Sequence, residues 1–142
     1  MIKKVVILHP SHWEQAMGGA ELQISYLTKE LVRQGYEVHF IYENKGNRIE
    51  NNIGINLHPL RKVRLRKWFG QRWFLYRNQI QVKLNKIKPD VIYSRFYSSW
   101  SGFAADFAYK NKSKHIWAVA SDNDLYRQYQ NVSFLRPFDI IE

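Results

Sequence analysis

The first 35 residues combine three features whose order restricts the fold. An aliphatic run at residues 3–8 is typical of a strand buried on both faces of a parallel sheet. Gly18 and Gly19 follow in a loop, and helical spacing then continues to Gln34, ahead of Gly35, which suits a left-handed C-cap. This order brings backbone N–H groups and a helix dipole toward an anion, most often a phosphate. The chain is therefore predicted to handle a nucleotide or a phosphorylated substrate.

The rest of the chain alternates predicted strands with predicted helices. The apolar patterns predict further strands at residues 36–42, 53–60, 90–94 and 115–120, and helices at residues 19–34, 68–87 and 102–110. Such alternation favours an α/β fold with a Rossmann-like, doubly wound parallel sheet. A chain of 142 residues is long enough for one domain with its own core. Residues 138–142 resemble the opening of another element, so we expect a truncated piece of a longer protein.

The composition excludes several classes of protein. The chain contains no cysteine, which rules out disulfides and thiolate metal sites and gives no sign of secretion. The apolar run near the start, Val5–Leu8, is too short for a signal-peptide core or a membrane span. We therefore expect a cytoplasmic location.

The net charge of +10 is concentrated in one segment. Residues 1–60 carry six basic and six acidic side chains, as do residues 89–142, whereas residues 61–88 carry ten basic side chains and no acidic one. A local positive block indicates an anionic surface as partner. Aromatic rings beside its cations suit an anionic bilayer surface. The candidates for membrane contact are Arg64, Arg66, Lys67, Trp68 and Arg72.

Two other interpretations of this basic segment stay open. A solvated helix face would need no partner at all. Nucleic acid is the third possibility, and it is disfavoured because no nucleic-acid-binding motif accompanies the patch. The rings of Phe69, Trp73 and Tyr76 recur at helical spacing, so we expect them to face the core rather than a partner.

The glycine pair has a functional and a purely structural interpretation. Without a Cβ at Gly18 and Gly19, a ligand oxygen can approach the backbone at the start of the helix. The structural alternative is a flexible loop that closes at the helix start. The pair does not form a G-x-G-x-x-G pattern, and no Walker lysine follows, so those two nucleotide-binding folds are disfavoured.

Polar side chains follow three of the predicted strands at their carboxyl ends, where open α/β sheets bind ligands. His12 and Asp122 are candidates for acid–base work, and His9, Arg95, Ser121 and Asp124 are candidates for binding an acceptor. The structural alternatives are solvated loop histidines, a surface arginine, and turn or cap chemistry after the fifth strand. No third ligand keeps a suitable spacing with the two histidines, so we expect no metal site.

Several motifs together resemble those of the N-terminal half of retaining GT-B glycosyltransferases, family 4 in particular. They are Lys4–Leu8 as first strand, Gly18-Gly19-Ala20-Glu21 at the helix start, Gly35-Tyr36-Glu37-Val38-His39 leading into the second strand, and Pro89-Asp90-Val91-Ile92-Tyr93 at the fourth. The resemblance covers nearly the whole chain. Each motif is degenerate by itself, and their order and spacing make the combination fairly specific.

The resemblance implies two Rossmann-like domains with a cleft between them. The nucleotide sugar would bind mostly to the C-terminal domain and the acceptor to the N-terminal one, with Gly18 and Gly19 near the donor phosphates. Many relatives place a histidine after the fifth strand, where this chain has Ser121 and Asp122. A role carried over to that position is therefore in doubt.

We accordingly expect residues 1–142 to be the N-terminal, acceptor-side domain of a retaining, nucleotide-sugar-dependent hexosyltransferase. The C-terminal donor-binding domain is absent from the chain, so the fragment is expected to be inactive. We expect no cofactor beyond the nucleotide-sugar co-substrate, no nucleic-acid partner, a membrane-linked envelope glycan as acceptor, and a peripheral position on the inner face of the cell membrane. The alternatives are a non-catalytic phosphate- or nucleotide-binding Rossmann-like module and, less favoured, a GT-B epimerase.

Overall fold

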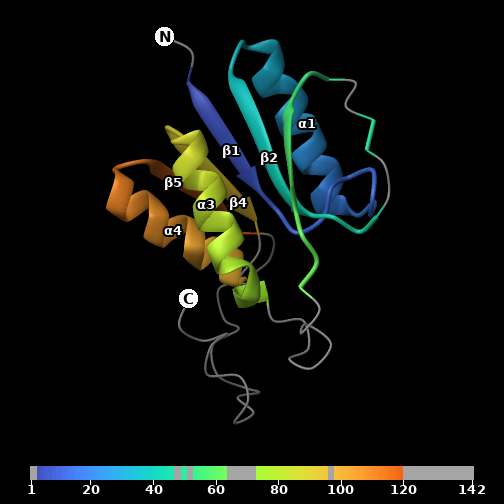
Figure 1. Ribbon diagram of the computed structural model, residues 1–142. Coiled ribbons are helices and arrows are strands. Elements are labelled where there is room, and N and C mark those ends of the chain that lie inside the picture. The colour runs from blue at the N-terminus through green and yellow to red at the C-terminus, as the bar shows by residue number, and fades with distance from the viewer. Residues whose placement is uncertain (1–2, 47–48, 51–52, 64–72, 96–97, 120–142) are drawn as a thin grey trace.

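A computed structural model describes residues 3–46, 49–50, 53–63, 73–95 and 98–119 (Figure 1). Two groups of predicted site residues lie outside these ranges. They are the membrane candidates Arg64, Arg66, Lys67, Trp68 and Arg72 and the polar candidates Ser121, Asp122 and Asp124.

Five parallel strands form one sheet in the order β3-β2-β1-β4-β5. The strands are β1 (Lys4–Leu8), β2 (Glu37–Glu43), β3 (Asn56–Leu60), β4 (Val91–Arg95) and β5 (Lys114–Ala118). β1 lies at the centre, where Val6 is opposite His39 of β2 on one side and Ile92 of β4 on the other. The predicted Rossmann-like parallel sheet is confirmed.

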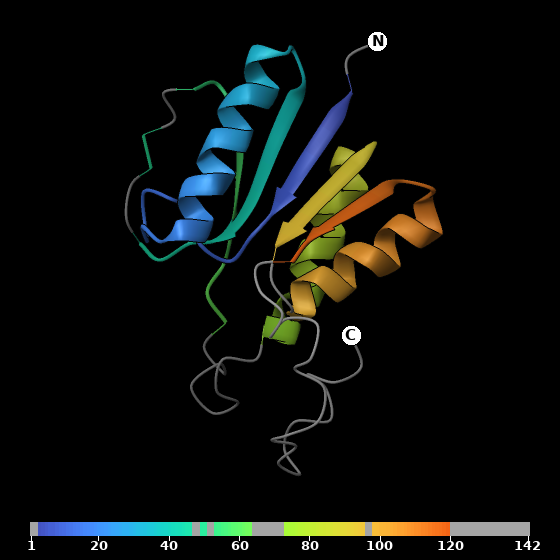
Figure 2. The same ribbon diagram turned by 180° about the vertical axis from the view of Figure 1, so that it is seen from behind.

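The helices cover both faces of this sheet. They are α1 (Gly19–Arg33), the 3-10 turn η1 (Trp73–Tyr76), α3 (Arg77–Ile87) and α4 (Ser99–Asn111). The two opposite views show α1 on one face and α3 with α4 on the other (Figures 1 and 2). Parallel neighbours need such crossover connections, because the chain must return to the same end of the sheet before each new strand.

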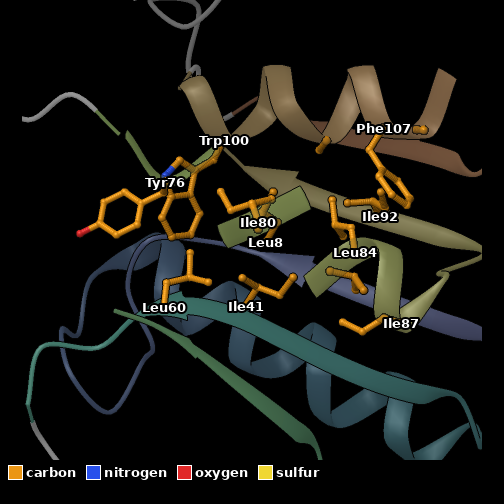
Figure 3. Packing of buried hydrophobic residues seen from close by; sticks show 13 residues of the cluster. Leu8, Ile41, Leu60, Tyr76, Ile80, Leu84, Ile87, Ile92, Trp100 and Phe107 are labelled. Atoms are coloured by element: carbon orange, nitrogen blue, oxygen red, sulfur yellow. The ribbon is translucent and has the colours of Figure 1, made fainter. Parts of the chain in front are cut away.

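Two apolar clusters join these layers. On the α3 and α4 face, side chains from four strands meet the two helices, as Figure 3 shows. This cluster comprises Val6, Leu8, Ile41, Leu60, Tyr76, Ile80, Leu84, Ile87, Ile92, Trp100, Ala104, Phe107 and Ala108. The cluster on the α1 face comprises Ile7, Ile24, Val38, Phe40, Tyr42 and Ile55. Alternate residues of β1 therefore supply both clusters, as expected of a strand buried on both faces.

The end of α1 follows the predicted cap closely. Gly35 has a φ of 83°, in the left-handed region that favours glycine. Its N–H donates to the carbonyl of Val32 at 3.0 Å, and the N–H of Tyr36 donates to that of Leu31 at 3.1 Å. These two bonds form a Schellman motif, which satisfies two carbonyls at the helix end and turns the chain into β2.

Three predicted boundaries differ from the structure. The helix predicted at residues 68–87 is, within the described residues, the 3-10 turn η1 at Trp73–Tyr76, and its α-helical part begins at Arg77. The third strand begins at Asn56 rather than at residue 53, because the chain turns at Gly54, whose φ is 70°. α4 begins at Ser99, three residues before the predicted start at Gly102. The reason is tertiary packing, since the buried ring of Trp100 meets Tyr76 with centroids 5.6 Å apart and so holds the first turn of the helix.

One substitution tests the α3 face of the core. Leu84 is fully buried, whereas Val82 on the same helix is 67% exposed. Leu84→Ala is expected to lower the free energy of unfolding by about 2–5 kcal/mol, through lost burial and a residual cavity. Val82→Ala, the matched control, should change it by about 0.5 kcal/mol or less. Urea unfolding measures both, and equal effects would contradict the packing described.

Candidate functional site

The carboxyl ends of all five parallel strands lie at one edge of the sheet. The order in which the chain adds strands changes direction between β1 and β4. From β1 the chain proceeds to β2 and β3 on one side, and it later crosses to β4 and β5 on the other. Open α/β sheets bind ligands outside the carboxyl ends of their strands at such a switch point. His9 directly follows β1, and Arg95 ends β4. Because Leu8 is paired with Ser94, His9 and Arg95 are neighbours at this point.

The imidazole of His9 is buried and held in one orientation. Its Nδ1 lies 2.8 Å from the carbonyl oxygen of Ser11 and 3.2 Å from the backbone nitrogen of Ser11. The tautomer of the ring decides whether Nδ1–H donates to the carbonyl or Nδ1 accepts from the N–H. Burial lowers the pKa of His9, and the charges of Arg95 and Lys45 act in the same direction. The Ser11 hydrogen bond and the charge of Glu21 oppose them. The ring is therefore neutral at pH 7, which is the form that can accept a proton or a hydrogen bond.

The helix start differs at its two glycines. Gly18 is the N-cap of α1, and a Cβ built there would lie 2.7 Å from the Oε2 of Glu21. The carboxylate of Glu21 thus folds back over Gly18. A Cβ on Gly19 would meet nothing within 4 Å, so packing does not require glycine at this position. Open space beside the first turn is compatible with the predicted approach of a ligand.

His12 lies in a different environment from His9. Its ring stacks on Trp13 with centroids 3.8 Å apart, and it also contacts Phe40 and Tyr42 of β2. Nδ1 accepts the N–H of Glu14 at 3.2 Å, while Nε2 has no hydrogen-bond partner among the residues that the structure describes. Burial lowers the pKa of His12 to about 4. Neither loop histidine is solvated, since His9 is 2% exposed and His12 is 1% exposed.

The other three histidines hold strands together. The Oγ of Ser94 lies 2.8 Å from the Nε2 of His115 on β5. Between β2 and β3, His39 Nδ1 lies 2.9 Å from His58 Nε2, and His39 Nε2 lies 2.9 Å from a carboxylate oxygen of Glu37. The two ring centroids are 5.2 Å apart, which matches the nitrogen–nitrogen distance plus the two ring radii. The two nitrogens therefore face each other across one hydrogen bond, in which the tautomers decide which ring donates.

Lys45 is a site residue that the sequence interpretation missed. It lies two residues beyond β2, and its Nζ donates to the Oγ of Ser11 at 2.8 Å. The signal was available, because the rule that singled out His9 and Arg95, polar side chains at carboxyl ends of strands, applies equally to the end of β2. No sequence pattern indicated its contact with a loop 34 residues away.

Two searches of the described residues bear on other kinds of site. Among those residues, no group of three or more His, Cys, Asp or Glu side chains could hold a metal ion. Within the same part of the chain, no helix has the length and apolar character needed to cross a membrane. The membrane and fifth-strand candidates lie outside that part and stay predictions.

The chain matches the model of a known protein family. A family model described as Glycosyltransferase Family 4 matches residues 17–141. This range contains the glycine pair, α1 and strands β2 to β5. A search among curated proteins found no match.

The burial of His12 has a consequence for acid stability. Its pKa of about 4 in the folded state lies below the ordinary value of 6.5, so between these pH values the unfolded chain binds the proton and the folded chain does not. This histidine is expected to cost the fold about 1–2 kcal/mol as the pH falls from 7 to 5. His12→Gln should lose less stability over that range in urea unfolding. The same pH dependence in both proteins would contradict the burial of His12.

Proposed function

The chain belongs to glycosyltransferase family 4, and we propose that it is the N-terminal, acceptor-side domain of a retaining transferase that uses a nucleotide sugar. The observation that carries the proposal is the family match over residues 17–141. The structure adds that His9 and Arg95 are neighbours at the switch point of the sheet, ahead of the loop that leads to α1. In such a transfer the bond between the anomeric carbon and the donor phosphate breaks. A glycosidic bond forms to the acceptor oxygen, and the acceptor hydroxyl loses its proton.

The residues at the switch point fit this chemistry. Backbone N–H groups and the dipole at the start of α1 stabilise negative charge that develops on a leaving phosphate. His9 is neutral with Nδ1 toward Ser11, so its Nε2 is the nitrogen left to meet an acceptor hydroxyl. The ring is only 2% exposed, so this contact also requires the loop after β1 to move. We assign His9 and Arg95 to the acceptor side. His12 can serve in acid–base catalysis only if its loop moves, since aromatic rings enclose it. Asp122, Ser121 and Asp124 stay candidates for the same edge.

We propose that a second, C-terminal domain supplies the other wall of the cleft. The groups that grip the donor diphosphate and ribose would belong to a C-terminal domain, encoded downstream of Glu142. A sugar-transfer assay on residues 1–142 is expected to show no turnover, whereas a protein that also contains the proposed C-terminal domain should transfer sugar. Robust turnover by residues 1–142 would contradict the two-domain proposal. A gene that stops at Glu142 would favour a non-catalytic phosphate-binding module.

Gly19 offers a test of ligand approach that is separate from folding. A methyl group there meets open space, so Gly19→Ala is expected to leave the free energy of unfolding within about 1 kcal/mol. In the full-length protein this variant should reduce kcat/KM about tenfold or more, because the methyl group would separate a donor phosphate from the backbone. Gln23→Ala on the exposed side of α1 is the control. An unchanged kcat/KM in Gly19→Ala would contradict the proposal that a donor phosphate binds at this position.

We further propose that the acceptor is membrane-linked, such as a polyprenol-pyrophosphate glycan or a lipid glycan of a bacterial envelope. The support is the basic segment, in which residues 61–88 carry ten cations and no acidic side chain. Each cation near an anionic bilayer contributes about 1 kcal/mol. The enzyme would then bind peripherally to the inner face of the membrane.

A vesicle-binding experiment tests this surface. Replacing Arg64, Arg66, Lys67 and Trp68 together is expected to weaken binding to anionic vesicles and to leave neutral vesicles unaffected. Replacing Lys3, Lys29 and Lys114 removes the same charge elsewhere and should retain most of the binding. Failure of the unmodified protein to bind anionic vesicles would end the membrane proposal.

A further inference from the structure

The loop between β1 and α1 is folded into a turn that hydrogen bonds hold in place. The N–H groups of Gln15 and Ala16 both donate to the carbonyl of His12, at 2.9 and 3.1 Å. The Oε2 of Glu14 accepts the N–H of Glu50 at 2.7 Å and so ties the turn to a distant part of the chain. The backbone of the turn is therefore well satisfied in this conformation.

Two side chains of the same turn are not satisfied. The Nε2 of His12 and both ends of the Gln15 amide, Nε2 and Oε1, are buried and have no hydrogen-bond partner among the residues that the structure describes. An unpaired buried donor or acceptor destabilises the conformation that buries it, because water would otherwise bond to it. The closed turn is therefore opposed by two of its own side chains.

Apolar contacts act in the other direction and keep the turn closed. The ring of Trp13 meets Phe40 of β2 edge-on, with centroids 5.2 Å apart, and the ring of His12 stacks on Trp13. The amide of Gln15 has no such part in the packing, since an apolar side chain of similar size would fill its space and leave no polar atom unpaired. A polar group at this position suits a second conformation, in which water or a ligand reaches it.

The ends of this segment allow it to move. Gly18 and Gly19 separate it from α1, and a Cβ built on Gly19 would meet nothing within 4 Å, so the backbone can change its direction there. At the other end, the carbonyl oxygen and the backbone nitrogen of Ser11 lie 2.8 and 3.2 Å from the Nδ1 of His9. Movement of the segment would therefore release the buried imidazole of His9.

We propose that residues 11–17 form a lid beside His9, which is closed in this structure and opens to admit a ligand to the carboxyl edge of the sheet. The closed state is held by aromatic packing and opposed by the unpaired polar atoms of Gln15 and His12, so the two states differ little in free energy. The identity of the ligand rests on the proposed transferase function. The two states of the lid do not depend on it.

Amide hydrogen exchange, followed by nuclear magnetic resonance in the unmodified protein and in Gln15→Leu, tests the lid. Leucine fills the space of Gln15 without a polar atom, so the closed state gains stability. Exchange of the Ala16 N–H is expected to slow about tenfold, because this N–H is released when the lid opens. The N–H of Glu50 should slow by a similar factor, because its bond to Glu14 breaks in the same movement.

Two further variants bracket this result. Gln15→Glu places a carboxylate in the same space, and burial of a charge costs more than burial of an amide, so both N–H groups should exchange faster than in the unmodified protein. Gln23→Leu makes the first substitution at an exposed position of α1 and is the matched control. It should change neither exchange rate.

Unchanged or faster exchange of Ala16 in Gln15→Leu would overturn the proposal, because the amide of Gln15 would then be satisfied in the closed turn, as by a buried water molecule. Slower exchange of Ala16 with an unchanged Glu50 would also overturn it, since the turn would then open without the rest of the lid. If both rates change as expected and a protein that contains the proposed C-terminal domain transfers no sugar, the lid stands and the transferase proposal fails.

Discussion

β1 pairs with β2 on one side and with β4 on the other, and the rest of the structure depends on this double pairing. Val5, Val6, Ile7 and Leu8 are all buried, with alternate side chains entering the two apolar clusters. Each such side chain contributes about 1.5–3 kcal/mol on burial. Because Val5–Leu8 have no solvent-facing side, each of these positions must be apolar, and polar side chains appear only at the two ends of the strand. His9 lies at that point.

The same central position creates the candidate site. After β1 the chain adds β2 and β3 on one side, and it then crosses over to add β4 and β5 on the other side. The loops that follow β1 and β4 therefore run in opposite directions from the carboxyl end of β1. At this end of the sheet lie His9, Arg95 and Lys45, and the loop after β1 leads on to the start of α1. The charges there do not cancel at His9. Arg95 and Lys45 both lower the pKa of its buried imidazole, and the carboxylate of Glu21 raises it.

The features that follow from local chemistry were predictable, and those set by distant contacts were not. β1 and the glycine cap of α1 were found because burial and a left-handed φ restrict the residues allowed. The start of α4 was missed because Trp100 is fixed by Tyr76, a residue of another helix. At the site, the rule for carboxyl ends found His9 and Arg95. It was not applied to Lys45, whose role depends on a hydrogen bond to Ser11.

A crystal structure of the full-length protein, with a nucleoside diphosphate and an acceptor bound, would test the transferase proposal most directly. The expected result places the diphosphate within hydrogen-bond distance of the backbone at the start of α1 and the acceptor hydroxyl beside His9. Ligands bound at the amino ends of the strands, or a second domain that leaves this edge of the sheet exposed to solvent, would contradict it.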